Sequence, residues 1–206
     1  MEPSVALEDA SALLVIDMQN DFVLPGAPMC VAGALKTVPR IRRVMDAFRR
    51  ARHPVIHVVR EHRPDGSDVE ITRRERFRAT GGFLVRGTPG CDIVANLCAL
   101  PGELRVVKTR FSGFFQTGLD ELLRQGRIRG VVLTGTQLPN CVRATAVDGL
   151  CLDYRVTVLR DACSSQTMSI HEANLRDLEN LGIPCPSVEQ YLRDTGTRAR
   201  FPSPFE

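Results

Sequence analysis

The sequence predicts an α/β protein, a three-layer αβα sandwich built around a mainly parallel, Rossmann-like sheet. Short apolar runs typical of buried strands alternate along the chain with amphipathic stretches typical of helices. Parallel strands need long crossover connections, so this alternation favours helices on both faces of a parallel sheet. We expect one domain over residues 1–206, because that length suits a single core. The tail at 193–206 is expected to gain its order from a neighbouring subunit.

The expected elements follow one another in regular order. Apolar runs predict strands at 12–16, 55–59, 104–107, 131–134 and 156–159, with a last short strand near Ile183. Helical spacing of apolar residues predicts helices at 38–51, 118–125, 141–152 and 169–181. The segment 61–98 is rich in Arg, Gly and Asp without sustained periodicity, and we expect it to form a loop over the active-site end together with a short helix.

Composition excludes several classes of protein. A hydrophobic fraction of 43% and a charged fraction of 25% are ordinary for globular proteins, which argues against a disordered, fibrous or coiled-coil chain. The Arg-rich stretches have no interleaved aromatic residues, so we expect no nucleic-acid partner. Seven cysteines without a CxxC pair favour reduced thiols over a disulfide framework or a structural zinc site. The start of the chain is acidic and the apolar runs are short, which predicts a cytoplasmic protein with no membrane contact.

Three reactive side chains each follow a predicted strand: Asp17, Lys108 and Cys141. Singly, each has an ordinary explanation as a turn cap, a solvated lysine or a buried thiol. Because the carboxyl ends of parallel strands meet at one edge of a sheet, we expect the three to converge. Cys141 could then attack a carbonyl carbon, with Lys108 and a helix amino terminus lowering its pKa and Asp17 moving protons.

Longer strings around these residues resemble the isochorismatase-like cysteine hydrolases: LLVIDMQNDF, KTRFSGFFQTGLDELLR and GTQLPNCVRATAVDGLCLDYRVTVLRDA. The resemblance covers about residues 10–192, and the family includes nicotinamidases, N-carbamoylsarcosine amidohydrolase and ureidoacrylate hydrolases. It implies a catalytic triad of Asp17, Lys108 and Cys141 in a homo-oligomer, either a dimer or a tetramer. It also implies a cis peptide bond between Thr136 and Gln137, and an oxyanion hole formed by the backbone N–H groups of Gln137 and Cys141.

One departure from the family concerns metal. Its nicotinamidases bind a metal through an Asp-x-His element after the second strand, whereas this chain has VVREHRPDG, with Arg60 in place of the Asp. We therefore expect no metal and no other cofactor, and interpret His62 as a pocket or loop residue. The isochorismate-cleaving members lack the nucleophilic cysteine, which makes amide hydrolysis the better expectation.

The predicted activity is cleavage of a C–N bond in a small amide or ureido compound through a covalent acyl- or carbamoyl-enzyme. Substrate contacts are expected from Phe22, Arg60, Phe111 and Phe114, and the planar fork of Arg60 suits a carboxylate. Two alternatives stay open: a nicotinamidase-type amidase, and a catalytically silent binding member of the same fold.

Overall fold

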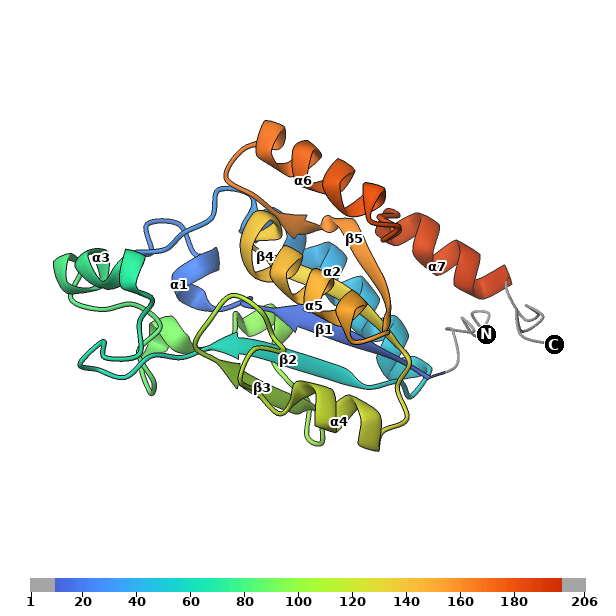
Figure 1. Ribbon diagram of the computed structural model, residues 1–206, viewed down its shortest axis with the longest axis horizontal. Helices are drawn as coiled ribbons and strands as arrows, with labels where there is room; N and C mark the ends of the chain where they lie inside the picture. Colours follow the sequence, from blue (N-terminus) through green and yellow to red (C-terminus); the bar gives the residue numbers. More distant parts are fainter. Residues whose placement is uncertain (1–9, 198–206) are drawn as a thin grey trace.

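The computed structural model describes residues 10–197, which form a five-stranded sheet with helices on both faces (Figure 1). The strands are β1 (Ser11–Ile16), β2 (Val55–Arg60), β3 (Leu104–Lys108), β4 (Gly130–Thr136) and β5 (Arg155–Ser164). They lie in the order β3-β2-β1-β4-β5, and every neighbouring pair is parallel. The three-layer sandwich predicted from the sequence is confirmed.

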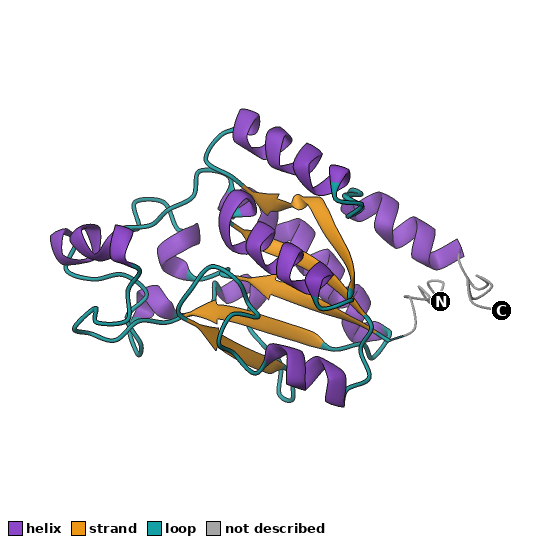
Figure 2. Cartoon of the chain, viewed as in Figure 1, coloured by secondary structure: helices purple, strands orange, loops and turns teal. Residues whose placement is uncertain are grey.

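The helices form the two outer layers (Figure 2). Helices α2 (Ala34–Arg50) and α7 (Val188–Thr197) pack on one face of the sheet, and α4 (Leu119–Gln125), α5 (Arg143–Cys151) and α6 (Met168–Asn180) pack on the other. The segment expected to be loop with a short helix contains α3 (Arg74–Ala79) and 3₁₀ turns at Ile71–Arg73, Pro89–Cys91 and Ala95–Leu97. A further short helix, α1 (Asn20–Val23), follows β1.

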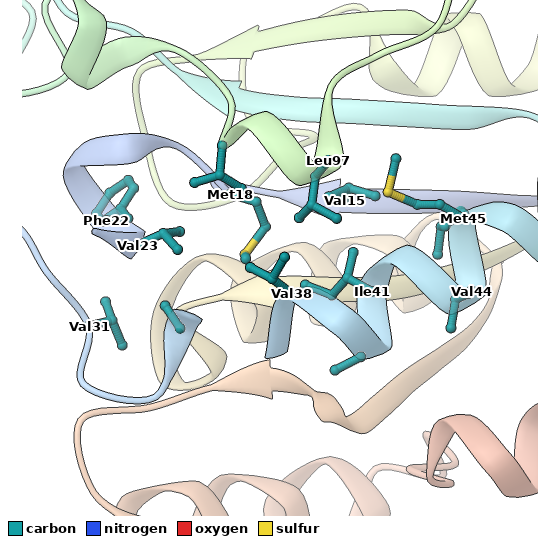
Figure 3. Packing of buried hydrophobic residues seen from close by; sticks show 14 of the residues in the cluster. Val15, Met18, Phe22, Val23, Val31, Val38, Ile41, Val44, Met45 and Leu97 are labelled. Atoms are coloured by element: carbon teal, nitrogen blue, oxygen red, sulfur yellow. The ribbon is translucent and has the colours of Figure 1, made fainter. Parts of the chain in front are cut away.

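Each face of the sheet has its own apolar cluster. Leu13 and Val15 of β1 point into the cluster shared with α2, part of which Figure 3 shows, whereas Leu14 and Ile16 point into the cluster shared with α4, α5 and α6. Because both faces of β1 are covered, the strand is apolar from Ala12 to Ile16 and does not alternate with polar residues. The sheet is therefore a rigid base for the residues that follow its strands.

The strand expected near Ile183 is wrong. The segment after α6 does run beside β5, where the carbonyl groups of Pro184 and Pro186 accept hydrogen bonds from the N–H groups of Val158 and Arg160 at 3.1 and 3.0 Å. Proline has no N–H group to return these bonds, so a two-way ladder cannot form. The chain continues into α7, which the apolar spacing did not predict.

The tail falls partly outside the description. Residues 193–197 belong to α7, whereas 198–206 lie outside the described residues, as do 1–9, so the expected ordering of the tail by a neighbouring subunit is not tested. Across 10–197, no helix combines the length and the apolar character needed to span a bilayer.

Candidate active site

Two of the three predicted triad residues form an ion pair at the carboxyl end of the sheet. Asp17 directly follows β1 and Lys108 ends β3, two strands away. Lys108 Nζ donates a hydrogen bond to Asp17 Oδ2 at 2.8 Å, and both side chains are completely buried. A second hydrogen bond from Lys108 Nζ, to the carbonyl of Arg110 at 3.1 Å, fixes the ammonium. Asp17 Oδ1 has no hydrogen-bond partner within 10–197, so one carboxylate oxygen stays free to accept a proton.

Cys141 lies in a π-helical turn, Leu138–Val142, between β4 and α5. The Cys141 carbonyl accepts a hydrogen bond from Thr145 Oγ1 at 2.6 Å, and Thr145 Oγ1 accepts one from the Gly113 N–H at 2.8 Å. These bonds tie the turn to α5 and to the loop after β3. The peptide bond between Thr136 and Gln137 is cis, as the family resemblance implied.

Gly135 lets β4 approach β1 closely just before this turn. Its φ of 117° is in the region that favours glycine, and a Cβ atom built there would lie 2.0 Å from the Ile16 carbonyl oxygen. No other residue fits without a shift of the backbone. The glycine thus brings the Cys141 turn beside the end of β1, where Asp17 lies.

The electrostatic state of the thiol differs from the expectation. Burial raises the pKa of Cys141, and the negative charge of Asp17 raises it further, while Lys108 and Arg60 act in the opposite direction. The lowered pKa expected from the sequence is therefore wrong for the chain without substrate, because the cost of a charge in this buried position outweighs the nearby cations. Burial thus favours the neutral form of the thiol, and the Asp17 carboxylate is among the groups that act on it.

Arg60, the last residue of β2, lies against the thiol. Its side chain is completely buried, with Nη1 paired to Glu70 and Nη2 donating to Cys141 Sγ at 3.6 Å. The guanidinium lies over the ring of Phe111, 5.2 Å from its centroid. Gln19 holds the Arg60 backbone from both sides, accepting from its N–H and donating to its carbonyl, each at 2.8 Å. Sequence reasoning missed Gln19, although it lies within the string LLVIDMQNDF, and it missed Glu70, which no pattern marks.

A cavity of about 240 Å³ opens onto Cys141. Phe22 lines it, as expected, and so does Gln137. The lining residues are Phe22, Met29, Cys30, Thr72, Arg73, Arg76, Gln137, Asn140, Cys141 and Gln166. A larger hollow of about 980 Å³ lies beside β3 near Glu61 and Arg105, and it contains none of the predicted triad. We take the smaller cavity as the candidate site because it contains the thiol.

The two other predicted aromatic contacts lie in different places. Phe111 stacks under the guanidinium groups of Arg60 and Arg73 and lines a neighbouring hollow. Phe114 does not line the cavity at Cys141. It stacks on Tyr154, with ring centroids 5.7 Å apart, and packs against α5, which makes it part of the core on that face.

Positive charge is in excess around the cavity. Arg73 and Arg76 line it and no carboxylate of the described chain does, whereas the charged groups around the sulfur balance, with Arg60 and Lys108 paired to Glu70 and Asp17. Arg73 is only loosely paired, 3.8 Å from Glu70, and its buried Nη1 has no hydrogen-bond partner among residues 10–197. A buried donor without a partner is costly, which makes this atom a ready site for an acceptor on a ligand.

The residues at the end of β2 do not fit a metal ion. The Arg60 guanidinium, a permanent cation, occupies the place where a ligand carboxylate would be needed. His62 packs edge-on against Phe77 and Phe83 and lies outside the cavity lining, and burial, followed by the charge of Arg60, lowers its pKa. Over the described range, no three His, Cys, Asp or Glu side chains come together as a possible metal site.

The fold and the site define an α/β protein that holds a thiol, a carboxylate and an ammonium at the carboxyl end of a parallel sheet, below a small cationic cavity. The sequence model of the isochorismatase domain family matches residues 11–190 of this chain. The chain belongs to the isochorismatase family.

Individual relatives agree with this assignment. A protein of Arabidopsis thaliana named a probable inactive nicotinamidase is 41% identical over 187 residues, covering 89% of this chain and 95% of the relative. Ureidoacrylate amidohydrolase RutB of Caulobacter vibrioides is 36% identical over 181 residues, covering 78% of this chain and 80% of the relative. The crystal structure of an isochorismatase family protein from Desulfovibrio vulgaris has a TM-score of 0.88 at 49% identity, covering 92% of this chain and 99% of that one.

Proposed function

We propose that this chain is a hydrolase that cleaves the C–N bond of a small amide or ureido compound, with Cys141 as nucleophile. The observation that carries the proposal is the buried Lys108–Asp17 ion pair beside a thiol that lines a small cavity. A nucleophile, a proton carrier with one free oxygen and a fixed cation are the groups that a two-step amide hydrolysis needs.

In the first step Asp17 takes the thiol proton as Cys141 Sγ forms a bond to the substrate carbonyl carbon. The negative charge that develops on the carbonyl oxygen is stabilised by the backbone N–H groups of Gln137 and Cys141. The C–N bond then breaks, and Asp17 gives its proton to the leaving nitrogen, which departs as ammonia or an amine. The acyl or carbamoyl group stays on sulfur.

In the second step a water molecule attacks this covalent intermediate while Asp17 accepts one of its protons. The bond between carbon and sulfur breaks, the acid product leaves, and Asp17 returns the proton to Cys141. Lys108 keeps the Asp17 carboxylate in place throughout and offsets negative charge at the sulfur. Each cycle consumes one water and leaves the chain unchanged.

The charge of the cavity favours a substrate that carries a carboxylate. Arg73 Nη1 is buried without a hydrogen-bond partner in the described chain, and its guanidinium lies over Phe111 at 4.9 Å from the ring centroid. A planar fork held in this way matches a carboxylate geometrically. This requirement suits a ureido or N-carbamoyl acid, the kind of compound named for the ureidoacrylate amidohydrolase relative. Nicotinamide is uncharged and would bring no carboxylate to Arg73 Nη1, which has no hydrogen-bond partner in the described chain.

The catalytically silent alternative has support from one name, since the Arabidopsis relative is called a probable inactive nicotinamidase. Inactivity toward nicotinamide is compatible with activity toward an anionic amide, because the two substrates differ in the group that Arg73 would bind. The proposal also includes a cytoplasmic location, a homo-oligomer and a single domain over residues 1–206.

Ammonia release from ureidoacrylate, N-carbamoyl amino acids, nicotinamide and simple amides tests the proposal, with Cys141→Ala as the matched inactive control. We expect turnover of the anionic ureido compounds and a covalent adduct on Cys141 in mass spectra of the quenched enzyme. Turnover that persists in Cys141→Ala would contradict the nucleophile. No turnover of any of these compounds above the control would favour the silent binding member.

A further inference from the structure

The Arg60 side chain has no part in the two-step scheme, yet it donates a hydrogen bond to the nucleophile. Its Nη2 donates to Cys141 Sγ at 3.6 Å. Arg60 ends β2, the strand between β1, which Asp17 follows, and β3, which Lys108 ends. The sulfur therefore lies above three neighbouring strand ends, and the middle one supplies a permanent positive charge.

The guanidinium is fixed in place. Glu70 pairs with Nη1, the Phe111 ring lies beneath the plane, and Gln19 holds the backbone of the same residue at both its N–H and its carbonyl group. Nη1 lies on Glu70 and Nη2 on the sulfur, while Nε has no hydrogen-bond partner among the described residues. The side chain has no exposed surface and does not line the cavity, whereas Arg73 does, so we assign the substrate carboxylate to Arg73.

We propose that Arg60 is a catalytic residue whose fixed positive charge and N–H···S hydrogen bond stabilise the Cys141 thiolate at the moment Asp17 takes the thiol proton. This inference rests on the proposed function and adds a fourth side chain to it. Arg60 stabilises the sulfur most when the sulfur is charged, which is its state during attack. The contact therefore lowers the barrier more than it stabilises the resting thiol.

The other charged groups around the sulfur do not replace this contact. Asp17 becomes neutral when it accepts the proton, and Lys108, which is bonded to Asp17 and to the Arg110 carbonyl, is then a second cation near the thiolate. Glu70 and Arg73 face the sulfur from the segment after β2, with Glu70 on the far side of the guanidinium from the sulfur contact. Of the described cations, Arg60 is the one with a hydrogen bond to sulfur.

The pH dependence of Cys141 alkylation by iodoacetamide tests this role without any substrate, with mass spectrometry to separate Cys141 from the other cysteines. The neutral variant is Arg60→Met with Glu70→Leu, which removes both charges and leaves no unpaired carboxylate. We expect its alkylation midpoint to rise by about one pH unit or more, since removing an opposite charge within a few ångström has an effect of that size. Arg60→Lys, which keeps the charge, should shift the midpoint less.

The matched control is Arg49→Met with Glu103→Leu. This is another mostly buried pair, joined at 2.7 Å between Nε and Oε1, and it lies away from the cavity. Its midpoint should equal that of the unaltered chain. If the apolar double variant fails to fold by circular dichroism, Arg60→Gln with Glu70→Gln takes its place with the same expectation. A folded neutral variant with an unshifted midpoint, or an equal shift in the control, overturns the role of Arg60.

Because alkylation requires no turnover, this outcome is independent of the substrate screen. A raised midpoint in the neutral variant together with no hydrolysis of any amide would support Arg60 as the cation at the thiol and contradict the proposed function. Hydrolysis together with an unshifted midpoint would support the proposed function and contradict the role of Arg60.

Discussion

Lys108→Met should destabilise the fold as well as the chemistry. The Lys108–Asp17 pair is completely buried, at 2.8 Å, so removing the ammonium leaves a buried carboxylate without its hydrogen-bonded counter-charge. Breaking a buried pair in this way costs about 3–5 kcal/mol of the free energy of unfolding. For a chain of 206 residues each kcal/mol corresponds to roughly 2–4 °C in melting temperature, so we expect a loss of about 6–20 °C.

The double variant Asp17→Asn with Lys108→Met separates stability from catalysis. It buries no net charge, and Asn tolerates the backbone at position 17, where φ is 53°. Most of the lost stability should therefore return. Ammonia release should not return, since both the proton carrier and the cation are gone. Calorimetry and turnover at pH 7 measure the two effects. A Lys108→Met variant that melts within a degree or two of the unaltered chain, or a double variant that regains turnover, would refute the reasoning.

Three further predictions use other parts of the structure. Gly135→Ala should cost more than about 3 kcal/mol, read from urea unfolding, because its Cβ would meet the Ile16 carbonyl, whereas Gly118→Ala, with nothing within 4 Å, should cost little. Burial would raise the pKa of Glu103, but hydrogen bonds, led by the one from Arg49, lower it to about 2. The ionised Glu103 therefore contributes to the stability of the fold above pH ~4.3, and this contribution is lost as the pH falls toward 2. Glu103→Gln should lower the melting temperature at pH 7 and flatten its decline over that range; an unchanged decline would contradict this. Turnover should survive exhaustive chelation, and loss of activity that zinc or iron restores would argue against a metal-free site.

Much of the fold could be predicted because the strands of a sheet that is covered on both faces need continuous apolar runs. The runs at β1, β2 and β4 are of this kind, and each appears as a strand. The segment near Ile183 has the same apolar character but carries two prolines, and the missing N–H groups matter only once a neighbouring strand is in place. Helix α7 was missed because its role depends on a tertiary contact, the stacking of Tyr191 on Phe48 of α2.

The meeting of Asp17 and Lys108 could be predicted from topology, since both follow strands of one parallel sheet. The pairing of Arg60 with Glu70 could not, because Glu70 lies in a segment whose path has no periodic signal. Phe114 was expected to line the cavity because it follows the end of β3 in the string KTRFSGFF. It packs against Tyr154 instead and does not line the cavity. The direction of the Cys141 pKa also depends on burial, which no local string encodes.

A neutral resting thiol is consistent with the charges that surround it. Moving the proton from Cys141 to Asp17 exchanges one negative charge for another inside the same buried site, so the net charge of the site does not change during attack. The excess positive charge in the cavity therefore remains available to an anionic substrate before and after the transfer. An alkylation profile of Cys141 that follows an unperturbed thiol would contradict the raised pKa on which this charge exchange rests.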